Sequence, residues 1–108
     1  GIVLEALGSG NTTPTVVAAV RDAVAGGIPV IVSSRVPRGV LVPSYGGGGG
    51  GADLAAAGAV HSPTLRPGQA RILLAAMLAA GADRDAIAAA VDGRAPDRMS
   101  VPRRSLLW

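Results

Sequence analysis

The sequence predicts an α/β fold, a small three-layer domain in which helices flank a short parallel sheet. The apolar run Gly1–Leu7 is bounded by glycines, which is typical of a strand covered on both faces, as in a parallel sheet. A helical pattern and a second apolar run, Ile28–Val32, follow within about 30 residues, the length of a βαβ unit. Such crossovers pair their strands in parallel, and 108 residues hold a single core, so we expect one domain built on this unit.

The core must be built from small aliphatic side chains. Hydrophobic residues make up 49% of the chain, but it has one Tyr, one Trp and no Phe. At about 25 cal/mol per Å² of buried apolar surface, such side chains give a thin core. We therefore expect the domain to take part of its stability from a partner surface. The chain also begins within a strand and without Met, which suggests a piece cut from a longer protein.

Charge and cysteine content exclude several classes of function. The ten basic residues are all Arg, the net charge is only +3, and Arg103-Arg104 is the one adjacent pair. Scattered cations with almost no aromatics do not indicate nucleic-acid binding. The absence of Cys excludes disulfides and thiolate sites and is compatible with the cytoplasm, the location that we expect. No apolar run approaches the ~20 residues of a membrane span, and no charged segment precedes the first run as in a signal peptide.

The glycine turn Gly8–Asn11 follows the first strand at its carboxyl end, where open α/β sheets bind ligands. It does not complete the dinucleotide-binding fingerprint, because the third glycine position is Thr13 and no acidic residue ends the second strand. Backbone N–H groups at the start of the next helix could hold a carboxylate or an amide carbonyl. A turn that merely needs glycine for its geometry is an equally good interpretation.

A helix is predicted from Pro14 to the glycine pair Gly26-Gly27. Thr13 is its expected N-cap, and Pro14 suits the first helical position. Apolar residues at helical spacing should face the sheet: Val16, Val17, Val20 and Val24. The second strand, Ile28–Val32, ends at Ser33–Arg35, which we expect beside the first glycine turn.

The middle of the chain is irregular in pattern. Val40–Val42 could form a short strand, and the run Gly46–Gly51 should hold no regular element, because glycine loses the most backbone entropy on ordering. We favour a mobile surface loop or linker. The alternative is a loop that orders only against a ligand or another subunit. Asp53 is expected to cap a short helix, Leu54–Ala57, that ends at Gly58.

Two further helices follow a brief third strand, Ala59-Val60. The first runs from Pro67 to Gly81 and the second from Asp83 to Asp92. The apolar face of the longer helix should consist of Ile72, Leu73, Met77 and Leu78. Residues 94–108 are rich in Pro and Arg and show no periodicity, so the predicted domain is 1–93 and the rest is a poorly ordered tail.

The chain's polar residues do not form a complete catalytic site. His61, the only histidine, has neither Cys nor a close carboxylate in the sequence, and a structural role is expected for it. Glu5 lies inside an apolar strand, so it needs a partner such as Arg35 or an interface position. Hydroxyl groups at Thr13, Ser33 and Ser34 could donate hydrogen bonds in a cleft, but no base is placed to activate them. We predict no catalytic residue, metal site or cofactor in this chain.

Three blocks of sequence carry a family resemblance: GIVLE with GSGN in residues 1–11, GIPVIVSSRVPRG in residues 27–39, and AGAV at 57–60 leading to LRPGQARILL at 65–74. In this order and spacing, they resemble the C-terminal domain of bacterial L-asparaginases over residues 1–93. The resemblance implies a Rossmann- or flavodoxin-like fold and hydrolysis of asparagine, with glutamine as a second substrate. Family members are two-domain homodimers or homotetramers, and their nucleophilic threonine lies in the N-terminal domain, which this chain lacks.

The resemblance also implies which residues face the substrate. The C-terminal domain closes the active site of a neighbouring subunit, so we expect this chain to shape a substrate pocket and a subunit interface without turning over asparagine alone. Asn11 matches a family asparagine, and Thr13 takes the position of a second asparagine that helps to hold the substrate's α-amino group. The position of a family glutamate falls near Gly51, a departure from the family pattern. Ser34 is a weaker candidate for substrate binding.

Two other interpretations remain open from the sequence. One is a non-catalytic effector-binding or interaction domain that kept the fold and lost the enzyme. The other is an unrelated α/β domain that binds a nucleotide or a sugar.

Overall fold

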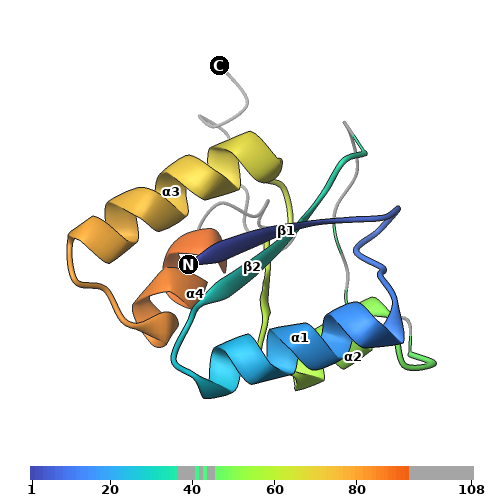
Figure 1. Ribbon diagram of the computed structural model, residues 1–108. Helices are drawn as coiled ribbons and strands as arrows, with labels where there is room; N and C mark the ends of the chain where they lie inside the picture. Colours follow the sequence, from blue (N-terminus) through green and yellow to red (C-terminus); the bar gives the residue numbers. More distant parts are fainter. Residues whose placement is uncertain (37–40, 42, 44–45, 93–108) are drawn as a thin grey trace.

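The computed structural model describes residues 1–36, 41, 43 and 46–92. In this part of the chain, three strands form one sheet with helices on both of its faces (Figure 1). The elements, in chain order, are β1 (Ile2–Ala6), α1 (Pro14–Ala25), β2 (Val30–Ser34), α2 (Gly51–Ala56), β3 (Val60–His61), α3 (Pro67–Ala79) and α4 (Arg84–Asp92). Helices α1 and α2 cover one face and α3 and α4 the other, which confirms the predicted three-layer α/β fold.

The strands are parallel and lie in the order β1-β2-β3. The register joins Ile2 to Val30 and Ala6 to Ser34, so the carboxyl ends of β1 and β2 meet at one edge of the sheet. The predicted bounds of the second strand were wrong by two residues. The Ile28 N–H donates to the Ala23 carbonyl and so still belongs to the end of α1, whereas the two serines continue the strand with their hydroxyl groups satisfied.

Alternate residues of β2 supply two separate core layers. Val30 and Val32 pack with α1 and α2, whereas Ile31 packs with α3 and α4. All five residues of β2 are buried, because this central strand is covered on both faces. The layers consist almost entirely of Ala, Val, Leu and Ile, as the composition predicted.

Helix α1 begins and ends as its sequence predicts. The Thr13 hydroxyl accepts the Val16 N–H at 3.3 Å, and Pro14 occupies the first helical position. Val17 and Val20 are buried, and Val16 and Val24 pack partly buried against the same core layer.

Part of the glycine run makes hydrogen bonds and enters a helix, which the sequence did not predict. Gly51 begins α2, so the expectation that no regular element includes the run was wrong at this residue. Asp53 stands in the first turn of α2, and its Oδ2 accepts the N–H groups of Gly48 at 2.9 Å and Gly50 at 3.0 Å. Gly47 and Gly48 have φ values of +88° and +94°, a conformation that side chains disfavour. The Asp53 carboxylate therefore holds the backbone of the glycine run by two hydrogen bonds and caps α2 from within its first turn.

The predicted apolar face of α3 was wrong in part. Ala70 and Leu74 are its buried residues, whereas Ile72 is 64% exposed and Leu78 37% exposed. The apolar arc of α3 is wider than the surface that the sheet and α4 cover, so periodicity alone could not show which side is buried. Around Ile72, the exposed part of the arc borders an open apolar groove of about 540 Å³.

Helix α4 is capped by the residue at which the sequence predicted its start. The Asp83 Oδ1 accepts the Ala86 N–H at 2.9 Å, and Ile87 and Val91 are fully buried. Arg84 adds a contact that the sequence did not indicate: its Nε and Nη2 both donate to the Gly58 carbonyl at 3.2 Å. This pair of bonds joins α4 to the turn before β3.

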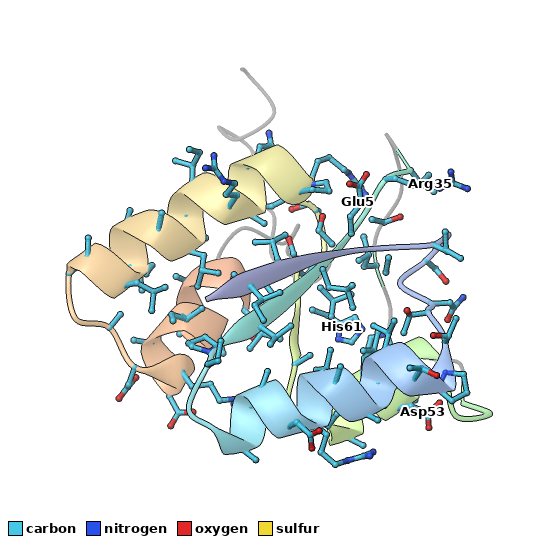
Figure 2. All side chains as sticks on the ribbon, in the orientation of Figure 1. Glu5, Arg35, Asp53 and His61 are labelled. Carbon is cyan, nitrogen blue, oxygen red and sulfur yellow. The ribbon has the colours of Figure 1, made fainter. Side chains whose placement is uncertain are left out.

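The expected partner for Glu5 was wrong. The side chain is exposed on edge strand β1, and no ion pair joins it to Arg35 (Figure 2). An exposed charge on an edge strand hinders pairing with a foreign strand and does not need a buried partner. The strand expected at Val40–Val42 lies outside the described residues except for Leu41, and the tail from Arg94 lies outside them entirely. Among the helices that the structure describes, none has the length and hydropathy to cross a membrane.

Candidate functional site

The candidate site lies at the carboxyl edge of the sheet, where the β1–α1 turn, the end of β2 and the glycine run come together. The turn and the start of α2 are neighbours in Figure 1, although 40 residues separate Asn11 from Gly51 in sequence. The prediction that the two turns after β1 and β2 share one edge is confirmed by a hydrogen bond from the Ser34 hydroxyl to the Gly8 carbonyl.

Asn11 joins the β1–α1 turn to the glycine run. Its backbone N–H donates to the Leu7 carbonyl and its carbonyl accepts the Leu7 N–H, both at 2.8 Å, which closes the turn. Its side-chain Oδ1 accepts the Gly51 N–H at 3.3 Å. No described contact uses the Nδ2 hydrogens of this half-buried side chain, so they are the donors that Asn11 can offer to a ligand.

A shallow pocket of about 360 Å³ lies between the turn and the glycines. Asn11, Thr12 and Pro14 line one side, and four glycines between Gly46 and Gly50 line the other. The Thr12 N–H donates to the Gly49 carbonyl at 2.7 Å, and a Cβ at Gly49 would come within 2.4 Å of the Thr12 oxygen. The pocket therefore exists in this form only with glycine at position 49.

Thr13 is exposed beside this pocket, and its hydroxyl accepts the Val16 N–H as the N-cap of α1. A hydroxyl that accepts one hydrogen bond still has a proton to donate. Thr13 can therefore face a ligand and cap the helix at the same time.

Ser34 has a different environment from the other two candidates. It is fully buried, its hydroxyl donates to the Gly8 carbonyl, and it accepts the Val36 N–H at 3.1 Å. Both hydrogen-bonding directions are used within the chain, so the side chain fixes the position of the glycine turn. Ser33 is also buried and donates to the Leu65 carbonyl at 2.7 Å on the other face of the sheet.

His61, at the end of β3, lies between the sheet and the helices α1 and α2 (Figure 2). Its Nε2 is buried and has no hydrogen-bond partner among the described residues. A Cβ at Gly10 would lie 3.7 Å from this nitrogen and a Cβ at Gly51 3.4 Å from it, so the ring fills the space beneath both glycines. Burial lowers the pKa of His61 below its ordinary value, because desolvation disfavours the charged imidazole.

This arrangement can bind and orient a ligand through amide, hydroxyl and backbone groups. The hydroxyls of Ser33, Ser34 and Ser62 all donate to backbone carbonyls, so none of these three serines is hydrogen-bonded to a side-chain base. The same part of the chain holds no group of three or more side chains suited to a metal ion. The sequence did not reveal the role of Gly49 or the position of His61, because both depend on contacts between distant segments.

The fold and the candidate site together define an α/β domain whose candidate ligand-binding elements follow the carboxyl ends of parallel strands. The model of the glutaminase/asparaginase C-terminal domain matches residues 1–91, and the chain belongs to this family. It is 39% identical over 87 residues to a probable L-asparaginase from Deinococcus radiodurans. The match covers 81% of the chain and 26% of that relative, so the chain spans about a quarter of the protein it resembles.

Proposed function

We propose that this chain is the C-terminal domain of an L-asparaginase-like amidohydrolase, which converts L-asparagine to L-aspartate and ammonia. The observation that carries the proposal is the family match over residues 1–91, together with the relative named a probable L-asparaginase. In this proposal, the nucleophile belongs to a part of the enzyme that precedes this domain, and we place the enzyme in the cytoplasm. The domain contributes one wall of the substrate pocket.

The candidate residues have distinct parts in the proposed pocket. The Nδ2 group of Asn11 and the hydroxyl of Thr13 are the donors offered to asparagine, since each keeps a hydrogen that no described contact uses. Ser34 acts indirectly, because its buried hydroxyl holds the Gly8 carbonyl and thereby positions the turn that carries Asn11. The pocket between Asn11 and the glycines supports this assignment, because it opens at the edge of the sheet where open α/β folds bind their ligands.

A chimera tests the proposal. The segment of the Deinococcus radiodurans relative that matches this chain is replaced by residues 1–92, and ammonia release from L-asparagine is measured for the chimera and for the isolated chain. We expect turnover by the chimera and none by the isolated chain. Clear turnover by the isolated chain would contradict the proposal that the nucleophile lies elsewhere.

Two variants of the active chimera then test the site. Thr13→Val removes a donor and the helix cap, whereas Thr13→Ser keeps both hydroxyl functions. If Thr13 contacts the substrate, Thr13→Val raises KM for asparagine by about tenfold, the equivalent of one hydrogen bond of ~1.4 kcal/mol, and Thr13→Ser stays close to the parent. An equal KM for all three proteins would remove Thr13 from the proposed pocket. An inactive but folded chimera that asparagine still stabilises against heat would favour the effector-binding alternative.

We further propose that the exposed face of α3 packs against another part of the asparaginase assembly, which we expect to be a homodimer or homotetramer. Ile72 stands 64% exposed beside the groove that Leu65, Leu73 and Ala76 help to line. An exposed apolar surface of this kind is typical of an interface. In the chimera, Ile72→Asp should shift the sedimentation profile toward smaller species, with Arg71→Asp as the neighbouring control. An unchanged profile would exclude this face from the interface.

A further inference from the structure

The imidazole of His61 occupies the space where the two halves of the candidate site meet. Gly10 belongs to the β1–α1 turn and Gly51 to the first residue of α2, and a Cβ at either glycine would touch the imidazole. The Gly51 N–H in turn donates to Asn11, so His61 lies directly behind the hydrogen bond that holds the two halves together. Buried Leu41 packs on the same side, since its Cδ2 would also contact a Cβ at Gly10.

The surroundings of this ring suit an uncharged imidazole. Its Nε2 is buried, and no described residue accepts a hydrogen bond from it. The turn from Leu7 to Asn11 carries no charged side chain, nor do Leu41 and Pro43. On α2 the charged group is Asp53, whose Oδ2 is engaged by the N–H groups of Gly48 and Gly50. Arg35, after the end of β2, is exposed. The charged imidazolium carries an N–H on both ring nitrogens, so protonating the ring leaves a buried Nε2–H with no acceptor among the described residues.

We propose that His61 is a pH-dependent latch of the site: its uncharged ring lets the β1–α1 turn and the start of α2 close on each other, and its protonated form separates them. The first structural consequence is loss of the hydrogen bond from the Gly51 N–H to Asn11. The second is opening of the pocket between Asn11 and the glycines. This inference rests on contacts within the chain and does not depend on the asparaginase assignment.

The direction of the pH dependence follows from the buried ring. Because the pKa of His61 is lowered in the folded chain, the unfolded chain binds the proton more readily. The stabilisation of the folded chain by the uncharged His61 ring is complete above the ordinary histidine pKa of about 6.5. It is lost as the pH falls below that value toward the pKa of the folded chain.

Nuclear magnetic resonance of the 108-residue chain tests the latch directly. His61 is the only histidine, so one imidazole signal reports its titration without assignment ambiguity. Amide hydrogen exchange is measured from pH 8 to pH 5 and expressed as a protection factor, which corrects for the intrinsic pH dependence of exchange. We expect the protection factor of the Gly51 amide to fall by up to about tenfold as His61 becomes protonated, the scale of losing one hydrogen bond. The Ile28 amide, which donates to Ala23 at the far end of α1, is the internal control and should keep its protection.

The variant His61→Gln carries an amide that does not titrate, and it should show no acid-linked loss of protection at Gly51. His61→Asn is the second variant if the longer side chain perturbs folding, and the wild-type measurement needs neither. The latch is refuted if the Gly51 protection factor stays constant while the imidazole titrates. It is also refuted if a folded His61→Gln or His61→Asn chain loses protection at Gly51 over the same pH range.

Discussion

The carboxamide oxygen of Asn11 accepts a hydrogen bond from the backbone N–H of Gly51, which lies forty residues later in the chain. This bond joins the turn after β1 to the start of α2, and its acceptor residue Asn11 also lines the pocket proposed to receive asparagine. A residue predicted to contact substrate is therefore also a structural contact, and the two roles use different atoms of one side chain.

Replacing Asn11 separates these roles. Asn11→Ala removes the acceptor for the Gly51 N–H, and we expect a loss of about 1 kcal/mol in the free energy of unfolding, the usual net value of one hydrogen bond. Asn11→Asp keeps an oxygen acceptor but loses the Nδ2 donors. It should retain most of the stability while weakening asparagine binding in the chimera. Urea unfolding measures the loss of stability, and KM of the chimera measures the weaker binding of asparagine. Equal losses of stability for Asn11→Ala and Asn11→Asp would show that the hydrogen bond to Gly51 contributes little.

Two glycines of the same run should respond oppositely to alanine. A Cβ at Gly49 would lie 2.4 Å from the Thr12 carbonyl oxygen, whereas a Cβ at Gly46 meets no heavy atom within 4 Å. We expect Gly49→Ala to destabilise the chain by about 1–3 kcal/mol, because the backbone must move to relieve the overlap. Gly46→Ala should instead stabilise it by about 0.4–1 kcal/mol, since alanine lowers the entropy of the unfolded chain.

Thermal unfolding of the two variants beside the wild type checks this pair. If both alanines stabilise the chain equally, the close contact between Gly49 and Thr12 does not form in solution. If both destabilise it, the run around Gly46 makes contacts that require glycine.

Ser34 and Ser33 are adjacent, and both are fully buried, but they differ in the cost of removing their hydroxyls. Ser34→Ala leaves the Gly8 carbonyl and the Val36 N–H without their partner, so we expect a loss of about 1–3 kcal/mol. Ser33→Ala should cost less, about 0.5–1.5 kcal/mol, because the Leu65 carbonyl also accepts the Ser62 hydroxyl at 3.0 Å. Chemical denaturation of both variants gives the ranking, and a larger loss for Ser33→Ala would contradict it.

Local patterns predicted most of the architecture, because they report interactions between neighbours in sequence. Thr13 and Pro14 marked the start of α1, and Asp83 marked the start of α4, since capping joins residues only three positions apart. The bounds of β2 were missed because serine interrupts an apolar pattern. The hydroxyls of Ser33 and Ser34 compensate for burial only through carbonyls elsewhere in the chain.

The sequence predicted where the candidate site lies in the fold but not which hydrogen bonds its residues make. Strand order and the glycine turn put Asn11 and Ser34 at one edge, which the parallel sheet confirms. Their partners, Gly51 and Gly8, could not be inferred, because a pattern in sequence carries no information on which distant backbone group lies opposite a side chain. The same limit applies to His61, whose burial depends on the segments that pack over β3.

Ile72 and Leu74 of α3 test which side of this helix faces the core. The sequence predicted Ile72 in the apolar face of the helix, whereas the structure exposes it. Leu74 is 4% exposed and packs with Ile31 and Ile87, whereas Ile72 is 64% exposed. Leu74→Ala should lower the free energy of unfolding by about 2–5 kcal/mol through loss of buried surface and the cavity left behind. Ile72→Ala should change it by no more than about 0.5 kcal/mol in the isolated chain, as is usual for an exposed position. Urea unfolding of both variants decides between the two orientations of the helix. A large loss for Ile72→Ala with a small one for Leu74→Ala would mean that α3 presents its other side to the sheet, and the proposed interface on α3 would then be wrong as well.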